Sequence, residues 1–220
     1  MSLYNSTNMS AAINTIGNLN IRSFCVTLQE LPEKWDFIAK HFKERGFNAE
    51  PFNGISAAVS GLKTLHEYNL DNPGGHWNIG VRPVATWLSF YMLWAAMNLL
   101  PNEHFFTTEW DCELPPDWRP RTEAALRDVP PDFDLLYIGS CCCQGHPNNR
   151  HIKGNVYETK NVQCGHCTIV AKKALPILLK TQRKVYAPLD ISVQLHSLPM
   201  LKTFVVLPRI ATQFGTNIPA

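Results

Sequence analysis

The sequence has little charge, and neither sign dominates. Charged residues make up 17% of the 220 residues, with 20 Lys and Arg against 18 Asp and Glu. This near-neutral balance gives no electrostatic reason to expect nucleic acid or a membrane surface as a partner, and it excludes neither. The apolar fraction of 45% and the aromatic fraction of 10% are those of a globular protein, and the length is enough for one sizeable domain.

Lys and Arg are absent from the first twenty residues, which also lack a compact apolar core. A secretory signal needs both features, so this stretch does not match one. We therefore expect residues 1–20 to form a poorly ordered tail, residues 21–220 to form a single domain, and the protein to be cytoplasmic. In that compartment the seven cysteines are expected to be reduced thiols.

A second absence concerns the 20 positions from Pro83 to Asn102, which carry no charged residue. Their number is sufficient to span a bilayer, so a membrane helix is one interpretation. Thr86, Ser89 and Asn98 interrupt the apolar character, however, and this favours the other interpretation. We expect a buried core helix from about Val84 to Leu100.

Short apolar runs alternate with longer amphipathic ones along the chain. The predicted strands are residues 21–28, 47–55, 104–108, 133–139, 166–170 and 203–207, and the predicted helices are 31–45, 84–100 and 172–180. Loops are predicted at 57–79 and 141–154, and irregular chain is predicted around the prolines at 115, 116 and 120. This alternation predicts a Rossmann-type α/β fold, with a mostly parallel sheet covered by helices on both faces. Ligands of such sheets bind beyond the carboxyl ends of the strands.

Two carboxylates, Glu109 and Asp111, follow directly after the apolar run HFFTT. A strand there would bring both to the carboxyl edge of the sheet, and residues two apart point the same way in extended chain. Paired hard oxygen ligands suit Mg²⁺ or Mn²⁺ held jointly with substrate phosphates. The pattern therefore predicts a cation site for a diphosphate, and a pair of solvated acids at a strand end is the alternative.

Eight segments occur in an order that is typical of one enzyme family. They are IRSFCVTLQELPEKWDFIAKHF, EPFNGISA, VRPVATWLSFYMLWAAM, HFFTTEWDCELP, FDLLYIG, QCGHCTIVAKKALPILL, APLDISV and VVLPRIATQ. Together they resemble the lipopolysaccharide-type glycosyltransferases of family twenty-five, which includes the collagen galactosyltransferases, over about residues 21–213. Three positions depart from the family's pattern. Trp110 replaces the middle acid of an acidic triplet, Phe90 replaces a His, and Asn53 replaces an Asp.

The resemblance implies a GT-A fold and transfer of a sugar from a nucleotide-sugar donor, most simply a UDP-sugar, to an acceptor hydroxyl. A saccharide is the expected acceptor, with a protein side chain or a hydroxylated DNA base as alternatives. The resemblance places Mn²⁺ or Mg²⁺ on Asp111, with Glu109 as support, and makes Asp190 the catalytic base. The residues expected to contact the donor or the metal are Thr27, Leu28, Asn53, Gly54, Ser89 and Gln213.

Two further hypotheses compete with an active transferase. Trp110 in the acidic triplet is compatible with a binding module of the same fold whose metal site is impaired. A zinc-stabilised interaction protein is the other, because eight Cys and His residues lie close together in sequence: Cys141, Cys142, Cys143, His146, His151, Cys164, His166 and Cys167. Cys164 and Cys167 have zinc-knuckle spacing, but Cys167 falls inside a predicted strand, where it would be a small core residue. A redox role for the CGHC segment is disfavoured because that motif normally opens a helix.

Overall fold

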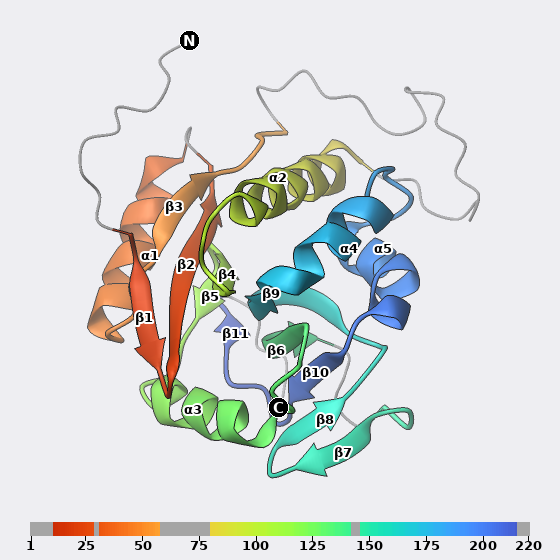
Figure 1. Ribbon diagram of the computed structural model, residues 1–220. Helices are drawn as coiled ribbons and strands as arrows, with labels where there is room; N and C mark the ends of the chain where they lie inside the picture. Colours follow the sequence, from red (N-terminus) through yellow and green to blue (C-terminus); the bar gives the residue numbers. More distant parts are fainter. Residues whose placement is uncertain (1–10, 29–30, 58–79, 142–145, 215–220) are drawn as a thin grey trace.

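The computed structural model describes residues 11–28, 31–57, 80–141 and 146–214 (Figure 1). Most of the loop predicted at 57–79 and two of the three adjacent cysteines, Cys142 and Cys143, lie outside the described residues. Nine strands form the main sheet: β1 (Ile13–Ile16), β2 (Leu19–Thr27), β3 (Glu50–Asn53), β4 (His104–Glu109), β6 (Leu135–Cys141), β7 (Arg150–Lys153), β8 (Val156–Glu158), β9 (Gln163–Ala171) and β10 (Thr203–Val206). A small second sheet pairs β5 (Cys112–Glu113) with β11 (Thr212–Gln213).

The order of the main sheet is β1-β2-β4-β9-β6-β10-β8-β7, with β3 also pairing with β2. Strands β3 and β4 are both parallel to β2, and β10 is parallel to β6. β9 runs antiparallel to both of its neighbours, β4 and β6, so β3, β2, β4, β6 and β10 all point the same way. The predicted mostly parallel sheet is therefore confirmed, with one reversed strand, β9, at its centre and two more, β1 and β8, nearer its edges. The carboxyl ends of the parallel strands share one edge.

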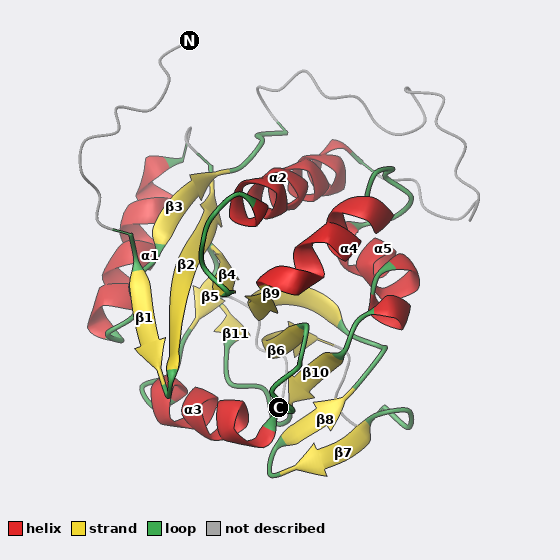
Figure 2. Ribbon diagram, viewed as in Figure 1, coloured by secondary structure: helices red, strands yellow, loops and turns green. Residues whose placement is uncertain are grey.

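Helices cover both faces of this sheet, as predicted (Figure 2). α1 (Pro32–Glu44) and α3 (Trp118–Asp128) pack on one face, and α2 (Val81–Asn98), α4 (Leu175–Thr181) and α5 (Leu189–His196) pack on the other. Neighbouring residues of β4 show the alternation that separates the two cores. Phe106 packs with the α1 side and Phe105 with the α2 side, and both are fully buried.

The uncharged segment is a core helix, as predicted. α2 buries Leu93 and Met97 completely against the sheet. Among the described residues, no helix combines the length and the apolar character that crossing a bilayer requires. α1 also matches its prediction, with Pro32 in the first turn and with Ile38 and Phe42 buried on one side.

The prediction of irregular chain is confirmed at Pro115 and Pro116 but wrong at Pro120, because α3 begins at Trp118 and includes Pro120. Pro120 lies in the first turn of α3, where its missing N–H costs no hydrogen bond. Trp118 starts the helix, is fully buried, and donates from Nε1 to the carbonyl of Arg45 at 2.8 Å. The loop predicted at 141–154 is also partly wrong, since the hairpin β7–β8 begins within it. The structure also contains α5, which no periodic pattern in the sequence predicted.

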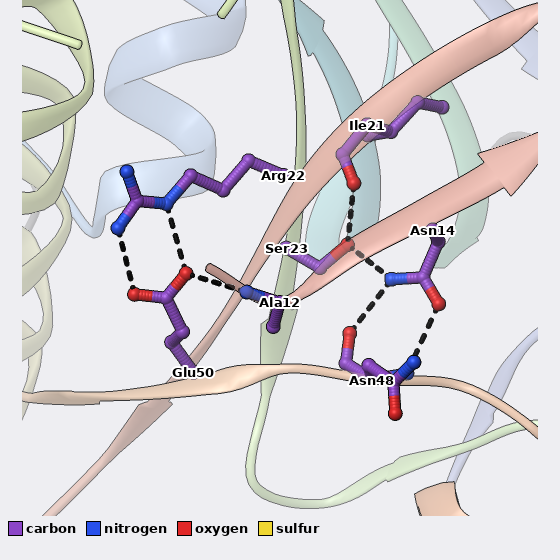
Figure 3. A network of polar contacts seen from close by, with 7 residues as sticks. All are labelled: Ala12, Asn14, Ile21, Arg22, Ser23, Asn48 and Glu50. Atoms are coloured by element: carbon purple, nitrogen blue, oxygen red, sulfur yellow. Dashed lines mark hydrogen bonds and ion pairs between the residues drawn. The ribbon is translucent and has the colours of Figure 1, made fainter. Parts of the chain in front are cut away.

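The predicted disordered tail is wrong for its second half, because β1 is a strand of the sheet. Asn14, which is 2% exposed, donates from Nδ2 to Ser23 Oγ and to the carbonyl of Asn48, both at 2.7 Å (Figure 3). The N–H of Asn48 returns a bond to Asn14 Oδ1 at 3.0 Å. One side chain thus joins β1 to β2 and to the segment before β3. A neighbouring pair, Arg22 and Glu50, is bidentate at 2.8 and 2.9 Å.

Candidate functional site

The carboxyl ends of β3, β2 and β4 place several of the predicted donor residues at one edge. Thr27 pairs with Asn53, and Val26 pairs with Glu109, so these strand ends lie side by side. The N–H of Gly54 donates to the carbonyl of Thr27 at 2.7 Å. The Asn53 side chain is exposed at this edge, whereas the Thr27 side chain is 2% exposed. Thr27 therefore offers backbone rather than side-chain contacts, and Leu28, which follows it, is partly exposed.

Ser89 of α2 holds this edge in place through its hydroxyl. Its hydroxyl donates to the carbonyl of Ala85 and accepts the N–H of Ile55, both at 2.7 Å. The side chain is 2% exposed and does not line the cavity described below. Ser89 thus anchors the turn at residues 53–55 to α2, and this structural contact explains its position without a ligand.

Replacing Gly54 with Ala is expected to destabilise the protein by about 1–3 kcal/mol, because the close approach of α2 leaves no room for a side chain. A Cβ at Gly54 would lie 2.8 Å from Ser89 Oγ and 3.1 Å from the carbonyl oxygen of Thr27. Gly80→Ala is the matched control, since a Cβ there meets no atom of the described residues within 4 Å. Urea denaturation of both variants measures the difference, and equal midpoints would contradict the close approach.

Glu109 is the carboxylate that faces a cavity. It is the last residue of β4, and its side chain lines the space between the sheet and α2. Burial raises the pKa of its carboxyl to about 8, and the negative charges of Asp111 and Asp190 add to the effect. Three carboxylates therefore lie within electrostatic reach of one another at the carboxyl edge.

Asp111 is placed differently from the prediction. The strand ends at Glu109 and the chain turns through Trp110, so the alternation that would have pointed both acids the same way stops. Asp111 does not line the cavity. Its Oδ2 accepts the side-chain amide of Gln213 at 3.2 Å, and Gln213 does line the cavity. Oδ1 of Asp111 is buried, with no hydrogen-bond partner among the described residues.

Trp110, the departure in the acidic triplet, lies on the α1 side of the sheet. It packs against the core beneath α1, and the Lys34 ammonium stands 3.7 Å from its ring centroid. Packing against the core and a cation–π contact therefore hold the indole in place. Its presence does not displace Glu109 from the cavity.

Asp190 enters the same cavity from α5. Its Oδ2 accepts the N–H of Cys164 at 3.1 Å, and its Oδ1 accepts the N–H of Ile191 at 2.9 Å. The alternative role of helix N-cap does not apply, because α5 begins at Leu189 and Pro188 occupies the cap position. Two backbone donors thus orient the carboxylate, and each oxygen keeps a lone pair for a further proton.

The donor set fits a divalent cation in part. No group of three or more His, Cys, Asp or Glu side chains within the described ranges is arranged to hold a metal ion. One or two protein carboxylates are nevertheless what Mg²⁺ and Mn²⁺ use when substrate phosphates and waters complete the shell. The unpartnered Oδ1 of Asp111 supports this fit, since a buried carboxylate oxygen without a donor carries an uncompensated cost.

The cavity has a volume of about 370 Å³. Its floor comes from β4, β6 and β9, and its walls come from α2, α4 and α5. Of the predicted site residues, only Glu109, Asp190 and Gln213 belong to its lining, and a stripe of residues four apart on α2, beginning at Arg82, is a signal that sequence reasoning missed. The lining includes Arg82, Pro83, Thr86, Phe90, Trp94, Thr107, Glu109, Leu135, Tyr137, Val162, Cys164, Gly165, Thr168, Val170, Leu178, Pro188, Leu189, Asp190, Val193 and Gln213.

The cysteines are not uniformly reduced, which corrects the prediction. Cys141 and Cys164 form a disulfide that joins the end of β6 to the start of β9. Cys25, Cys112 and Cys167 are free and buried. The zinc-knuckle pairing of Cys164 with Cys167 is not formed, because Cys164 is bonded elsewhere and Cys167 packs in the core on the α1 side. His166 is also buried, with Nε2 3.2 Å from the carbonyl oxygen of Ala211.

Comparisons with known proteins bear on the fold. No protein-family model matches the chain, and no curated protein matches it. Among solved structures, a glycosyltransferase involved in the glycosylation of the major capsid of PBCV-1 aligns over 88% of this chain and 92% of its own, with a TM-score of 0.51 and 11% identity. An inositol-1-phosphate CTP transferase from T. maritima aligns over 89% and 71% at 12% identity, but its TM-score of 0.39 is too low to bear on the fold. The chain therefore has a GT-A-like fold, and membership of family twenty-five stays a prediction.

Proposed function

We propose that the protein is a metal-dependent glycosyltransferase that moves a sugar from a nucleotide-sugar donor to an acceptor hydroxyl. The observation that carries this proposal is the meeting of Glu109, Asp111 and Asp190 at the carboxyl edge of a GT-A-like sheet, beside a cavity. The likeness to a capsid-glycosylating transferase supports it at the level of fold. The resemblance in sequence favours UDP as the nucleotide.

The donor's nucleotide is proposed to lie over the ends of β2 and β3. Asn53 is exposed there, and the turn at Gly54 allows close approach of the ligand to the backbone. Glu109 and Asp111 would hold Mn²⁺ or Mg²⁺ next to the diphosphate. The cation, when bound, supplies neutralisation of the negative charge that develops on the leaving diphosphate.

Asp190 is proposed to act as the base. It would take the proton from the acceptor hydroxyl while the acceptor oxygen forms a bond to the anomeric carbon and the bond from that carbon to the diphosphate oxygen breaks. The N–H groups of Cys164 and Ile191 hold the carboxylate in place for this transfer. Attack from the side opposite to the leaving group would invert the configuration at the anomeric carbon.

A screen of nucleotide sugars by thermal shift, with and without Mn²⁺, tests the donor class. A donor that binds the native state raises the melting temperature by mass action, and we expect this only when Mn²⁺ is present. Release of free UDP from the stabilising donor, measured in the same buffers, then shows whether the bound donor reacts. Stabilisation without turnover would instead identify an impaired sugar-nucleotide-binding module.

Asp190→Asn is expected to lower kcat by about 10²–10⁴-fold, with donor affinity unchanged, because Asn cannot take a proton but keeps an oxygen for the Cys164 N–H, at the loss of the bond from the Ile191 N–H. Steady-state kinetics and donor titration measure the two effects separately. If Asp190 only tethers α5 to β9, Asn would retain nearly full activity while Asp190→Ala would lose stability. That result would remove Asp190 from the mechanism.

A further inference from the structure

The cavity beside Glu109 is charged at one end and apolar at the other. Helix α2 presents Arg82, Thr86, Phe90 and Trp94 to it, each one turn after the last. Arg82 and Thr86 are exposed, whereas Phe90 and Trp94 are only 5% and 6% exposed. The helix therefore runs from the open, polar end of the cavity into its apolar depth.

The strands of the floor repeat this order. At the carboxyl edge stand Glu109 from β4 and, on the reversed strand β9, Cys164 and Gly165. One step inward, Thr107, Thr168 and Tyr137 are paired in register across β4, β9 and β6. A further step inward, Val170 and Leu135 are paired and lie against the cluster that contains Trp94 and Leu178.

Two hydroxyls in the middle of the cavity already donate to backbone carbonyls of the protein. Thr107 Oγ1 donates to the carbonyl of Thr168 at 3.3 Å, and Thr168 Oγ1 donates to the carbonyl of Gly165 at 3.5 Å. A saccharide in the depth would bury several hydroxyls with few free partners, and each such group would carry a desolvation cost. An apolar group meets no such cost there, because the deep walls are aromatic and aliphatic.

We propose that the depth of the cavity binds an apolar body, alkyl or aryl, that is attached to the acceptor hydroxyl. The hydroxyl would then sit at the charged end, within reach of Asp190 and Gln213. This rests on the proposed function and names the class of its acceptor. The whole cavity, its charged end included, has a volume of about 370 Å³, more than twice that of a cavity of roughly 150 Å³ that takes up benzene, so its depth has room for a ring or a short alkyl chain.

A series of primary alcohols from ethanol to 1-octanol, offered as acceptors with the donor and Mn²⁺, tests the proposal. Each added methylene buries more apolar surface, so kcat/KM is expected to rise about three- to fourfold per carbon until the cavity is full. Binding of 1-octanol alone, without donor or metal, is measured in parallel by thermal shift. A flat series together with absent octanol binding would overturn the apolar acceptor, even where the donor is hydrolysed.

Cavity-filling variants locate the effect. Val170→Phe fills the depth from β9 and Val193→Phe fills it from α5, and neither replaces a charged residue of the edge. Both are expected to lose at least tenfold in kcat/KM for 1-octanol, and urea denaturation shows whether each variant is folded. Leu195→Phe on α5, at a side chain that is 57% exposed, is the matched control and should behave as wild type.

The outcomes separate this proposal from the proposed function. Two results together support both proposals: the variants Val170→Phe and Val193→Phe abolish octanol binding, and kcat/KM for transfer rises with the length of the alcohol. Octanol binding without transfer at any chain length would overturn the acceptor assignment, whereas donor turnover in the same assays reports on the transferase separately. Equal octanol kinetics in folded Val170→Phe and Val193→Phe would overturn the cavity as the binding place.

Discussion

Asp111→Asn is expected to lower Mn²⁺-dependent transfer by about 100-fold or more while the protein stays folded. The substitution keeps the volume and an oxygen for the Gln213 amide, but it removes the charge that would meet the cation. Apparent Mn²⁺ affinity, taken from activity against metal concentration, should fall with kcat/KM. The free energy of unfolding, measured in urea, should stay within about 1 kcal/mol of wild type, since the buried Oδ1 loses an uncompensated charge.

The control for this variant is Asp117→Asn. Asp117 is exposed and its nearest cation is Arg121 at 3.8 Å, so the same chemical change there should leave activity unaltered. A fully active Asp111→Asn protein would remove Asp111 from the metal site. In that case Glu109, which does line the cavity, would have to carry the cation without it.

Glu109→Gln is expected to stabilise the metal-free protein at alkaline pH by about 2–4 kcal/mol. The pKa of Glu109 is raised from 4.5 to about 8 in the folded state, so folding binds a proton between these values. The favourable contribution is complete below pH 4.5 and is lost as pH rises towards 8. At pH 9 the wild-type protein must bury a charge that Gln does not carry, whereas at pH 4 the two should be equally stable.

Mn²⁺ should reverse this pH dependence in the wild type. A cation beside Glu109 favours the ionised carboxyl, so binding should release close to one proton at pH 7 and lower the apparent pKa. Urea denaturation at pH 4, 7 and 9, with and without Mn²⁺, measures both effects, and calorimetry in two buffers counts the proton. A wild-type protein as stable as Glu109→Gln at pH 9 without metal would contradict a half-buried Glu109 carboxyl with a raised pKa.

The sequence was most informative where one residue pattern determined one element. The length and apolar character of its segment were enough to predict α2, and Pro32 together with one apolar face was enough to predict α1. The wrong predictions concern segments whose secondary structure depends on tertiary contacts. α3 follows a proline-rich run because Trp118 fills the core beneath it, and β1 is ordered because Asn14 bonds to two other segments. No local pattern contains those partners.

The site divides in the same way. Glu109 and Asn53 follow apolar runs, and the sheet edge where they meet follows from parallel strand order. Asp190 was reached only through the resemblance, because its neighbours in space come from distant parts of the chain. The orientation of Asp111 depends on where the extended chain of β4 stops, and because it stops at Glu109, only one of the two acids faces the cavity. The apolar lining carried no signal that distinguishes it from ordinary core.

The reversed direction of β9 has a consequence for how Asp190 is held. Strands that end at an edge present their last carbonyls to it, whereas a strand that starts there brings amide hydrogens. Cys164 belongs to that start, and its main-chain N–H is what Asp190 accepts. Exchanging side chains at position 164 would leave this donor in place, so alanine scanning would pass over the contact that sets the direction of the carboxylate.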